Sequence, residues 1–248
     1  MKLKHRLRQW LWKFGVDISR FHPSIHPLAL RRQLFRSFGI EVVLDVGANT
    51  GQFALKLRTD TGYSGRIVSF EPLSSAFTAL QANARGDRLW EVHNFALGDA
   101  DGTEELNVAG NSESSSLLAM LPSHRRAAPE SAYVGRERVA VRTLDSVFDT
   151  IIARPCRIFL KIDTQGAESR VLRGGEKALA GIDTVQLEMS LLPLYEGERP
   201  LSEMLSLMEG KGYSLVSLEP GFADEHTGQV LQVDGIFHRL PAGRAARG

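Results

Sequence analysis

The sequence predicts an α/β protein with a doubly wound, mostly parallel sheet. Short apolar segments alternate with segments of helical periodicity along most of the 248 residues. The apolar segments are hydrophobic almost throughout, which is typical of strands that helices cover on both faces. Near the C-terminus two strand-like segments follow each other without a helix between them, which predicts an antiparallel hairpin at one edge of the sheet.

The predicted elements begin with two helical segments. Residues 1–14 are amphipathic at helical spacing, with leucine, tryptophan and phenylalanine on one face and basic residues away from it. Such a helix can pack on the sheet domain, on a partner subunit or on an anionic membrane surface, and the pattern leaves all three open. A second helix is expected at Leu28–Phe38, ended by Gly39. Residues 1–39 are thus predicted to be a helical extension.

The regular alternation starts after residue 40. Strands are expected at Val42–Val46, Arg66–Glu71, Trp90–Leu97, Arg157–Asp163 and Thr184–Met189. Helices are expected at Gly51–Arg58, Ser74–Ala84 and Glu168–Ala180. Because strand–helix–strand crossovers are right-handed in nearly all proteins, these segments predict one sheet with helices on both faces.

Two segments depart from the alternation. Residues 99–150 form an insertion with strand-like stretches at 103–108 and 138–144 around a serine-rich loop. A helix at Leu201–Gly210 precedes the hairpin strands at 213–220 and 229–240. The Gly/Ala/Arg-rich residues 241–248 are expected to be disordered. The folded domain is therefore predicted to span residues 40–240.

Composition excludes several classes of protein. Thirty basic and twenty-nine acidic residues leave a net charge of +1, which gives no electrostatic ground for nucleic-acid binding. The single cysteine, Cys156, excludes a disulfide framework and a cysteine-rich metal site. No apolar run reaches the roughly 18 residues that span a bilayer, and no export signal is evident. We expect a cytoplasmic protein; its oligomeric state is not predicted.

Small and acidic residues gather where the first two strands end. Asp45 is followed at alternate positions by Gly47, Asn49 and Gly51, and Glu71 ends the second strand. In an open α/β sheet, ligands bind at this edge. Glycines let the backbone approach a ligand closely, and an acid about 20 residues after a glycine turn is placed to bind ribose hydroxyls. The pattern predicts a cofactor that contains adenosine.

The acid ahead of the glycines favours S-adenosylmethionine over a nicotinamide dinucleotide. The fingerprint G-x-G-x-x-G is absent, and a carboxylate at this place suits a positively charged ligand. Asp45 is expected to bind the amino group of the methionyl part, and Ala96 and Leu97 to form a wall for the adenine ring. A nicotinamide-dependent oxidoreductase and a non-catalytic binding protein of the same fold are the alternatives.

The fourth strand ends in LKIDTQGAE, residues 160–168. Lys161 and Asp163 alternate on the strand, so both side chains point to the same side. A buried pair of this kind costs several kcal/mol of desolvation unless it is well hydrogen-bonded, which favours a functional role, with a structural ion pair as the alternative. Glu188, at the end of the fifth strand, is expected beside Asp163. The two acids suit either general base catalysis or a divalent cation.

Five segments together resemble the FkbM-type methyltransferases, over about Ile40 to Arg239. They are VLDVGANTGQFA, GRIVSFEP, FALGD, LKIDTQGAE and QVDGIFHR. The resemblance implies a Rossmann-like, seven-stranded, S-adenosylmethionine-dependent fold. It also implies O-methylation of a hydroxyl, typically on a sugar of a glycolipid or polysaccharide, or on a polyketide-type product.

The resemblance assigns single residues as well. Asp45, Gly47, Asn49 and Gly51 match the cofactor loop, Glu71 the ribose ligand, Ala96 and Leu97 the adenine wall, and Lys161, Asp163 and Glu168 the motif of the fourth strand. Gln165 stands where many members carry Glu, which weakens the case for a metal.

Methyl transfer needs an aligned acceptor oxygen and removal of its proton. We expect Asp163 to act as base or to position the base, with Lys161 tuning its charge and Glu188 assisting. In the alternative, Asp163 and Glu188 hold a divalent cation that lowers the pKa of the hydroxyl. The acceptor is expected to be a small molecule or a glycolipid. Tyr195 and Asp234 are further candidates for contact with it.

Overall fold

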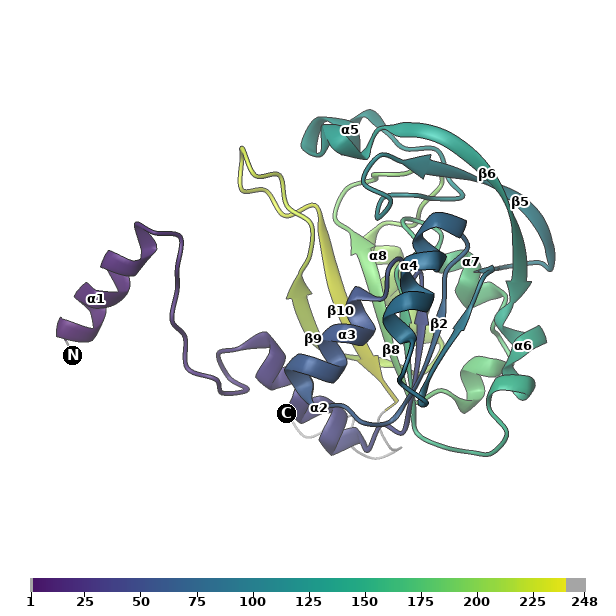
Figure 1. The fold of residues 1–248 in the computed structure, drawn as a ribbon, viewed down its shortest axis with the longest axis horizontal. Coiled ribbons are helices and arrows are strands. Elements are labelled where there is room, and N and C mark those ends of the chain that lie inside the picture. The colour runs from purple at the N-terminus through teal and green to yellow at the C-terminus, as the bar shows by residue number, and fades with distance from the viewer. Residues whose placement is uncertain (1, 240–248) are drawn as a thin grey trace.

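The structure is a computed structural model that describes residues 2–239, with side chains from residue 7 onward. The tail predicted to be disordered, 241–248, lies outside the described residues. Figure 1 shows a twisted central sheet between helices, a smaller sheet above it, and an N-terminal helix that stands apart.

Seven strands form the central sheet in the order β3-β2-β1-β7-β8-β10-β9. Their bounds are β1 Val42–Val46, β2 Arg66–Phe70, β3 Trp90–His93, β7 Ile158–Ile162, β8 Thr184–Ser190, β9 Ser214–Pro220 and β10 Gln232–His238. Neighbours from β3 to β8 run parallel, and β10 runs antiparallel to both β8 and β9. The predicted sheet and its C-terminal antiparallel hairpin are confirmed, with β9 at the edge.

Helices cover both faces of this sheet. One face packs against α2 (Pro27–Phe38), α3 (Gln52–Lys56) and α4 (Ser74–Ala84), and the other against α6 (Leu144–Ile151), α7 (Glu168–Arg173) and α8 (Leu201–Gly210). Val43 of β1 packs on the first face and Leu44 on the second, and both are fully buried. Burial on both faces is why the strands are apolar almost throughout.

Two predicted elements are shorter than expected. The strand predicted at Trp90–Leu97 splits in two, because Asn94 turns out of the central sheet and its amide donates to the carbonyls of Glu71 and Pro72 at 2.9 and 3.0 Å. The helix predicted at Glu168–Ala180 ends at Arg173. A Cβ at Gly174 would overlap the carbonyl oxygen of Gly98, so the chain needs a glycine there. A short 3₁₀ helix, η3 (Ala178–Gly181), follows.

The helix predicted at Gly51–Arg58 is α3 followed by one π turn, η1 (Leu57–Thr61). The insertion and the short strand just before it form a second sheet of three strands in the order β4-β6-β5. It consists of β4 (Ala96–Gly98), β5 (Gly102–Ala109) and β6 (Tyr133–Thr143), with α5 (Pro122–Ala127) and η2 (Pro129–Ser131) between the last two. The strands predicted at 103–108 and 138–144 are therefore present.

The N-terminal helix α1 (Lys2–Trp12) projects away from the sheet domain (Figure 1). Leu7, Trp10 and Phe14 are 56%, 54% and 65% exposed. Packing of this helix on the sheet domain, one of the three possibilities the sequence leaves open, is not what the structure shows. Asp17 instead binds the Arg8 guanidinium at 2.6 Å and fixes the end of the helix. No helix within residues 2–239 has the length and apolar character needed to cross a membrane.

Candidate active site

A cavity of about 1070 Å³ opens at the carboxyl ends of the central strands. Its walls come from the strand-end turns, from residues 111–117 of the insertion and from the loop between β9 and β10. Eight of the predicted site residues line it: Gly47, Asn49, Glu71, Ala96, Leu97, Lys161, Asp163 and Glu188. Asp45 and Gly51 do not. The structure therefore brings most of the predicted residues to one place.

The turn after β1 is shaped by positive backbone angles. Gly47 has φ 71°, and a Cβ there would overlap the backbone oxygen of Asp163. Asn49 also has a positive φ, 47°, and its N–H donates to Glu71 Oε2 at 2.8 Å. The other oxygen of Glu71 accepts the N–H of Leu73 at 2.8 Å. Glu71 thus ties the glycine turn to the end of β2, and burial raises the pKa of its carboxyl to about 7.

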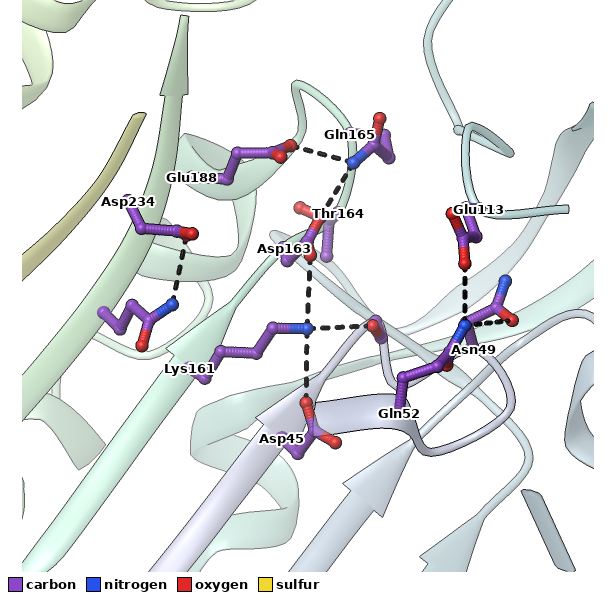
Figure 2. A network of polar contacts seen from close by, with 12 residues as sticks. Asp45, Asn49, Gln52, Glu113, Lys161, Asp163, Thr164, Gln165, Glu188 and Asp234 are labelled. Carbon is purple, nitrogen blue, oxygen red and sulfur yellow. Dashed lines mark hydrogen bonds and ion pairs between the residues drawn. The ribbon is translucent and has the colours of Figure 1, made fainter. Parts of the chain in front are cut away.

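Asp45 lies behind the cavity wall. It is fully buried and stands in register with Ser69 of β2 and Lys161 of β7. Lys161 Nζ lies 3.3 Å from Asp45 Oδ1 and 3.3 Å from Asp163 Oδ2, and it donates to the carbonyl of Gly47 at 3.1 Å (Figure 2). The predicted contact between Asp45 and the amino group of the cofactor does not fit this placement, since Lys161 stands between Asp45 and the cavity.

The Lys161 ammonium is stabilised by its neighbours. Burial alone would lower the pKa of Lys161, but the carboxylates of Asp163 and Asp45 outweigh it and raise that pKa above its ordinary value. Burial in turn raises the pKa of Asp45, against the opposing effect of Lys161. Lys161 therefore joins the glycine turn, β1 and the end of β7 into one charged unit at the cavity.

Gly51 has a packing role. Its φ is 91°, and a Cβ at this position would overlap the Trp90 ring and Leu80. Glu168 has a comparable structural role at the other turn, where Oε1 accepts the N–H groups of Thr164 and Gly166 at 2.8 and 3.2 Å. Burial raises the pKa of Glu168 to about 7. Both residues hold turns that carry the site and do not face the cavity.

Gln165 joins the two acids that were predicted to act together. It has φ 56°, and its amide nitrogen donates to Asp163 Oδ1 and to Glu188 Oε2, each at 2.8 Å (Figure 2). Its amide oxygen accepts the Tyr195 hydroxyl at 2.7 Å. Asp163 and Glu188 are therefore neighbours, as predicted. Sequence reasoning did not foresee the amide between them, because a positive φ at glutamine has no reliable sequence pattern.

Glu188 sits in an acidic environment. Burial raises its pKa well above the ordinary value, and the nearby carboxylates of Asp163, Glu168 and Asp234 raise it further. A carboxyl with a raised pKa is a stronger proton acceptor once it is ionised.

The arrangement of Asp163 and Glu188 does not match a divalent cation site. Magnesium and calcium take six or more oxygen ligands, whereas here an amide N–H₂ group lies between the two carboxylates. Within residues 7–239, no group of three His, Cys, Asp or Glu side chains is placed to hold a metal.

A short segment of the insertion, the serine loop (residues 111–116), closes one side of the cavity. Asn49 donates to Ser112 Oγ at 3.1 Å, and Ser116 Oγ donates to the backbone oxygen of Gln165 at 2.7 Å. Tyr195 also donates to the backbone oxygen of Ser114 at 3.3 Å. The loop is thus bound to the glycine turn, to the turn after β7 and to the segment after β8.

Comparison with known proteins gives the site a chemical context. Residues 45–215 match the family model described as the methyltransferase FkbM domain. The chain is 28% identical over 214 residues to the 31-O-demethyl-FK506 methyltransferase FkbM of Streptomyces tacrolimicus, covering 77% of this chain and 79% of that protein. It is 27% identical over 176 residues to the 2-O-methyltransferase NoeI of Sinorhizobium fredii, covering 67% and 70%.

A solved structure, the FkbM methyltransferase of Methylobacillus flagellatus, has 16% identity and a TM-score of 0.46. The alignment covers 79% of this chain, and this chain spans 43% of that one.

Proposed function

The chain belongs to the FkbM family of S-adenosylmethionine-dependent methyltransferases, and we propose that it transfers the methyl group to a hydroxyl of a sugar. A sugar in a glycolipid or polysaccharide is the acceptor class we favour, with a polyketide-type hydroxyl as the alternative. The two relatives described above are named for O-methylation. The observation that carries the proposal is the Asp163–Gln165–Glu188 arrangement beside the Gly47 turn.

The cavity has the charge that this cofactor needs. Eight carboxylate side chains line it, against three from lysine or arginine. S-adenosylmethionine carries a positive sulfonium, which an acidic cavity attracts. We place its ribose at Glu71, its adenine at Ala96 and Leu97, and its methionyl part along the Gly47 turn. The nicotinamide alternative is not retained, because the family is one of methyltransferases.

When bound, S-adenosylmethionine would supply the methyl group to the acceptor oxygen, with a neutral thioether as the leaving group, and the acceptor proton would go to a carboxylate of the site. Lys161 orients Asp163 through their 3.3 Å contact. Gln165 fixes Glu188 next to it. We assign hydroxyl orientation to Asp163 and proton acceptance to Glu188.

Replacing Asp163 tests these roles. Asp163→Asn keeps the shape but removes the charge that orients the acceptor hydroxyl toward Glu188, so we expect turnover to fall about 10²- to 10⁴-fold, the range for losing a proton transfer that depends on this orientation. Calorimetric titration with S-adenosylhomocysteine is expected to show little change in affinity. Wild-type activity is expected to survive exhaustive chelation with EDTA. Unchanged turnover of Asp163→Asn would show that Asp163 has no part in the reaction. Loss of wild-type activity on chelation would instead support the alternative in which a divalent cation activates the hydroxyl.

The acceptor class needs a direct screen. We suggest incubating the protein with tritium-labelled S-adenosylmethionine and octyl glycosides of glucose, galactose, mannose, fucose and rhamnose, with a macrolide alcohol as the comparison. Label in at least one glycoside is expected. Label in the macrolide alone would move the acceptor to the polyketide class.

We propose that α1 lies on an anionic membrane surface when the acceptor is a glycolipid. Leu7 and Trp10 of the helix and Phe14 just after it expose apolar surface, and Lys13, which directly follows the helix, adds positive charge. Apolar burial and attraction to anionic lipid both strengthen such binding. In flotation with phosphatidylglycerol vesicles, we expect the full chain to float and a chain lacking residues 1–20 to stay at the bottom. Equal behaviour of the two chains would contradict the membrane contact.

A further inference from the structure

Four carboxylates form one row across neighbouring strands at the cavity. Glu188 of β8 is paired with Asp234 of β10, and Asp234 is paired with Glu219 of β9. Asp163 directly follows Ile162, the partner of Leu187, and so continues the row beyond Glu188. Residues in register share one face of a sheet, and all four carboxylates line the cavity.

The two ends of the row are neutralised by cations and the middle is not. Lys161 contacts Asp163 at 3.3 Å, and Arg31 binds Glu219 at 2.8 Å. Glu188 and Asp234 have amide partners in their place. Gln165 and Gln232 both donate to Glu188 Oε2 at 2.8 Å, and Gln186 donates to Asp234 Oδ1 at 3.0 Å. These bonds leave Glu188 Oε1 and Asp234 Oδ2 for a ligand.

A second observation at the same wall also indicates a ligand that donates hydrogen bonds. Gln186 lines the cavity and is only 3% exposed, and its amide oxygen has no hydrogen-bond partner within the described part of the chain. Its amide nitrogen is used on Asp234. The N–H₂ groups of all three glutamines therefore point at carboxylates. This wall of the cavity therefore presents hydrogen-bond acceptors, and a ligand that binds there needs hydrogen-bond donors.

The spacing of the two middle acids limits what they can bind. Residues directly opposite each other on antiparallel strands have Cβ atoms about 4.5–5.5 Å apart. Glu188 and Asp234 are such a pair. Carboxylates on side chains whose Cβ atoms are this close can each accept a hydrogen bond from groups on adjacent carbon atoms of one ligand. A monofunctional alcohol would use only one of them.

We infer that the acceptor carries a second hydrogen-bond donor, a hydroxyl or an ammonium, on the carbon next to the methylated hydroxyl, and that Asp234 binds it. Glu188 then faces the reacting hydroxyl. The inference rests on the proposed methyl transfer and makes Asp234 a specificity-determining residue. An anionic group on that neighbouring carbon is disfavoured, since it accepts hydrogen bonds and would meet Asp234 and Glu188.

Acceptor analogues test this pairing. The glycoside labelled in the octyl glycoside screen is compared with analogues whose neighbouring hydroxyl is replaced by hydrogen, by methoxy, by an amine or by a carboxylate. We expect kcat/KM to fall about 10- to 100-fold for the hydrogen analogue, as for loss of a hydrogen bond to a charged group. The methoxy and carboxylate analogues are expected to be poorer still. The amine analogue shows whether Asp234 prefers an ammonium or a hydroxyl as the second donor, because its kcat/KM is compared with that of the parent glycoside.

Variants of Asp234 complete a double-mutant cycle. Asp234→Ala is expected to lower kcat/KM on the parent glycoside and to change it little on the hydrogen analogue. Asp234→Asn, which keeps the shape, serves if the alanine variant does not fold. Glu209→Gln, on the exposed side of α8, is the control and is expected to behave as wild type.

The outcomes separate the two claims. Equal kcat/KM on parent and hydrogen analogue, or equal losses on both in Asp234→Ala, would overturn the role of Asp234 while methyl transfer stands. Binding of S-adenosylhomocysteine without methylation of any glycoside would overturn the proposed function, and the role of Asp234 with it.

Discussion

At the scale of single residues, Lys161 organises the site. Its ammonium contacts Asp45, Asp163 and the carbonyl of Gly47 together. The alternation of Lys161 and Asp163 predicted that both face one side, and they do. The sequence did not reveal that Asp45 is the second partner of Lys161, because strand order decides which residues become neighbours in register.

The ionisation of Glu71 is expected to make both stability and cofactor affinity depend on pH. Its folded-state pKa of about 7 lies above the ordinary glutamate value, so its contribution to stability is full at low pH and is lost as pH rises through about 7. A ribose hydroxyl donates better to the ionised form, so cofactor affinity changes in the opposite direction. We expect S-adenosylhomocysteine to bind about tenfold more weakly at about pH 6 than at about pH 8.

Isothermal calorimetry in two buffers of different ionisation enthalpy measures this effect, since binding should release a proton near pH 7. Glu71→Gln is the matched variant and is expected to show weak binding without the pH dependence. A wild-type affinity that is flat between these pH values would remove the ionised carboxylate from cofactor binding.

At the scale of elements, the strand-end turns set the geometry of the site. The alternation of strands and helices predicted the central sheet, and the positions of Asp45, Glu71 and Asp163 predicted which edge carries the site. The division of the segment Trp90–Leu97 between two sheets could not be predicted, because apolar residues occur on both sides of the break and no glycine or proline marks it. It depends on the side chain of Asn94, which bonds to the carbonyls of Glu71 and Pro72.

Gly47→Ala tests the close approach of two turns. A Cβ at Gly47 would overlap the backbone oxygen of Asp163 and would also be strained by the positive φ. We expect this variant to lose several kcal/mol of folding free energy, at the upper end for single substitutions, and to lose cofactor binding. Urea denaturation measures the loss of folding free energy, and calorimetry measures the loss of cofactor binding.

Gly62→Ala is the matched control for this substitution. Gly62 has a similar φ of 69° and nothing within 4 Å of a Cβ, so only the cost of the backbone conformation remains, about 1–2 kcal/mol. Equal losses of folding free energy in Gly47→Ala and Gly62→Ala would mean that the close approach of residue 47 to the backbone oxygen of Asp163 does not restrict the side chain at position 47.

At the scale of the whole molecule, charge is separated although the total is near zero. The net charge of +1 excluded a nucleic-acid protein but gave no sign of the acidic cavity. The acids come from the ends of β2, β7 and β8, from β9 and β10, and from the insertion, and only the fold brings them together. The serine loop likewise meets the glycine turn through contacts between residues more than 60 positions apart. Local sequence patterns do not contain such information.

The central claim is that the cavity transfers a methyl group from S-adenosylmethionine to a sugar hydroxyl. The most direct measurement uses cofactor labelled isotopically in its methyl carbon, with two-dimensional NMR of the product from the octyl glycosides. A labelled methyl carbon correlated with a ring proton through an ether oxygen is the predicted result, absent with Asp163→Asn. A labelled methyl attached to a carbon atom, or an unmodified glycoside from a protein that binds S-adenosylhomocysteine, would contradict the account.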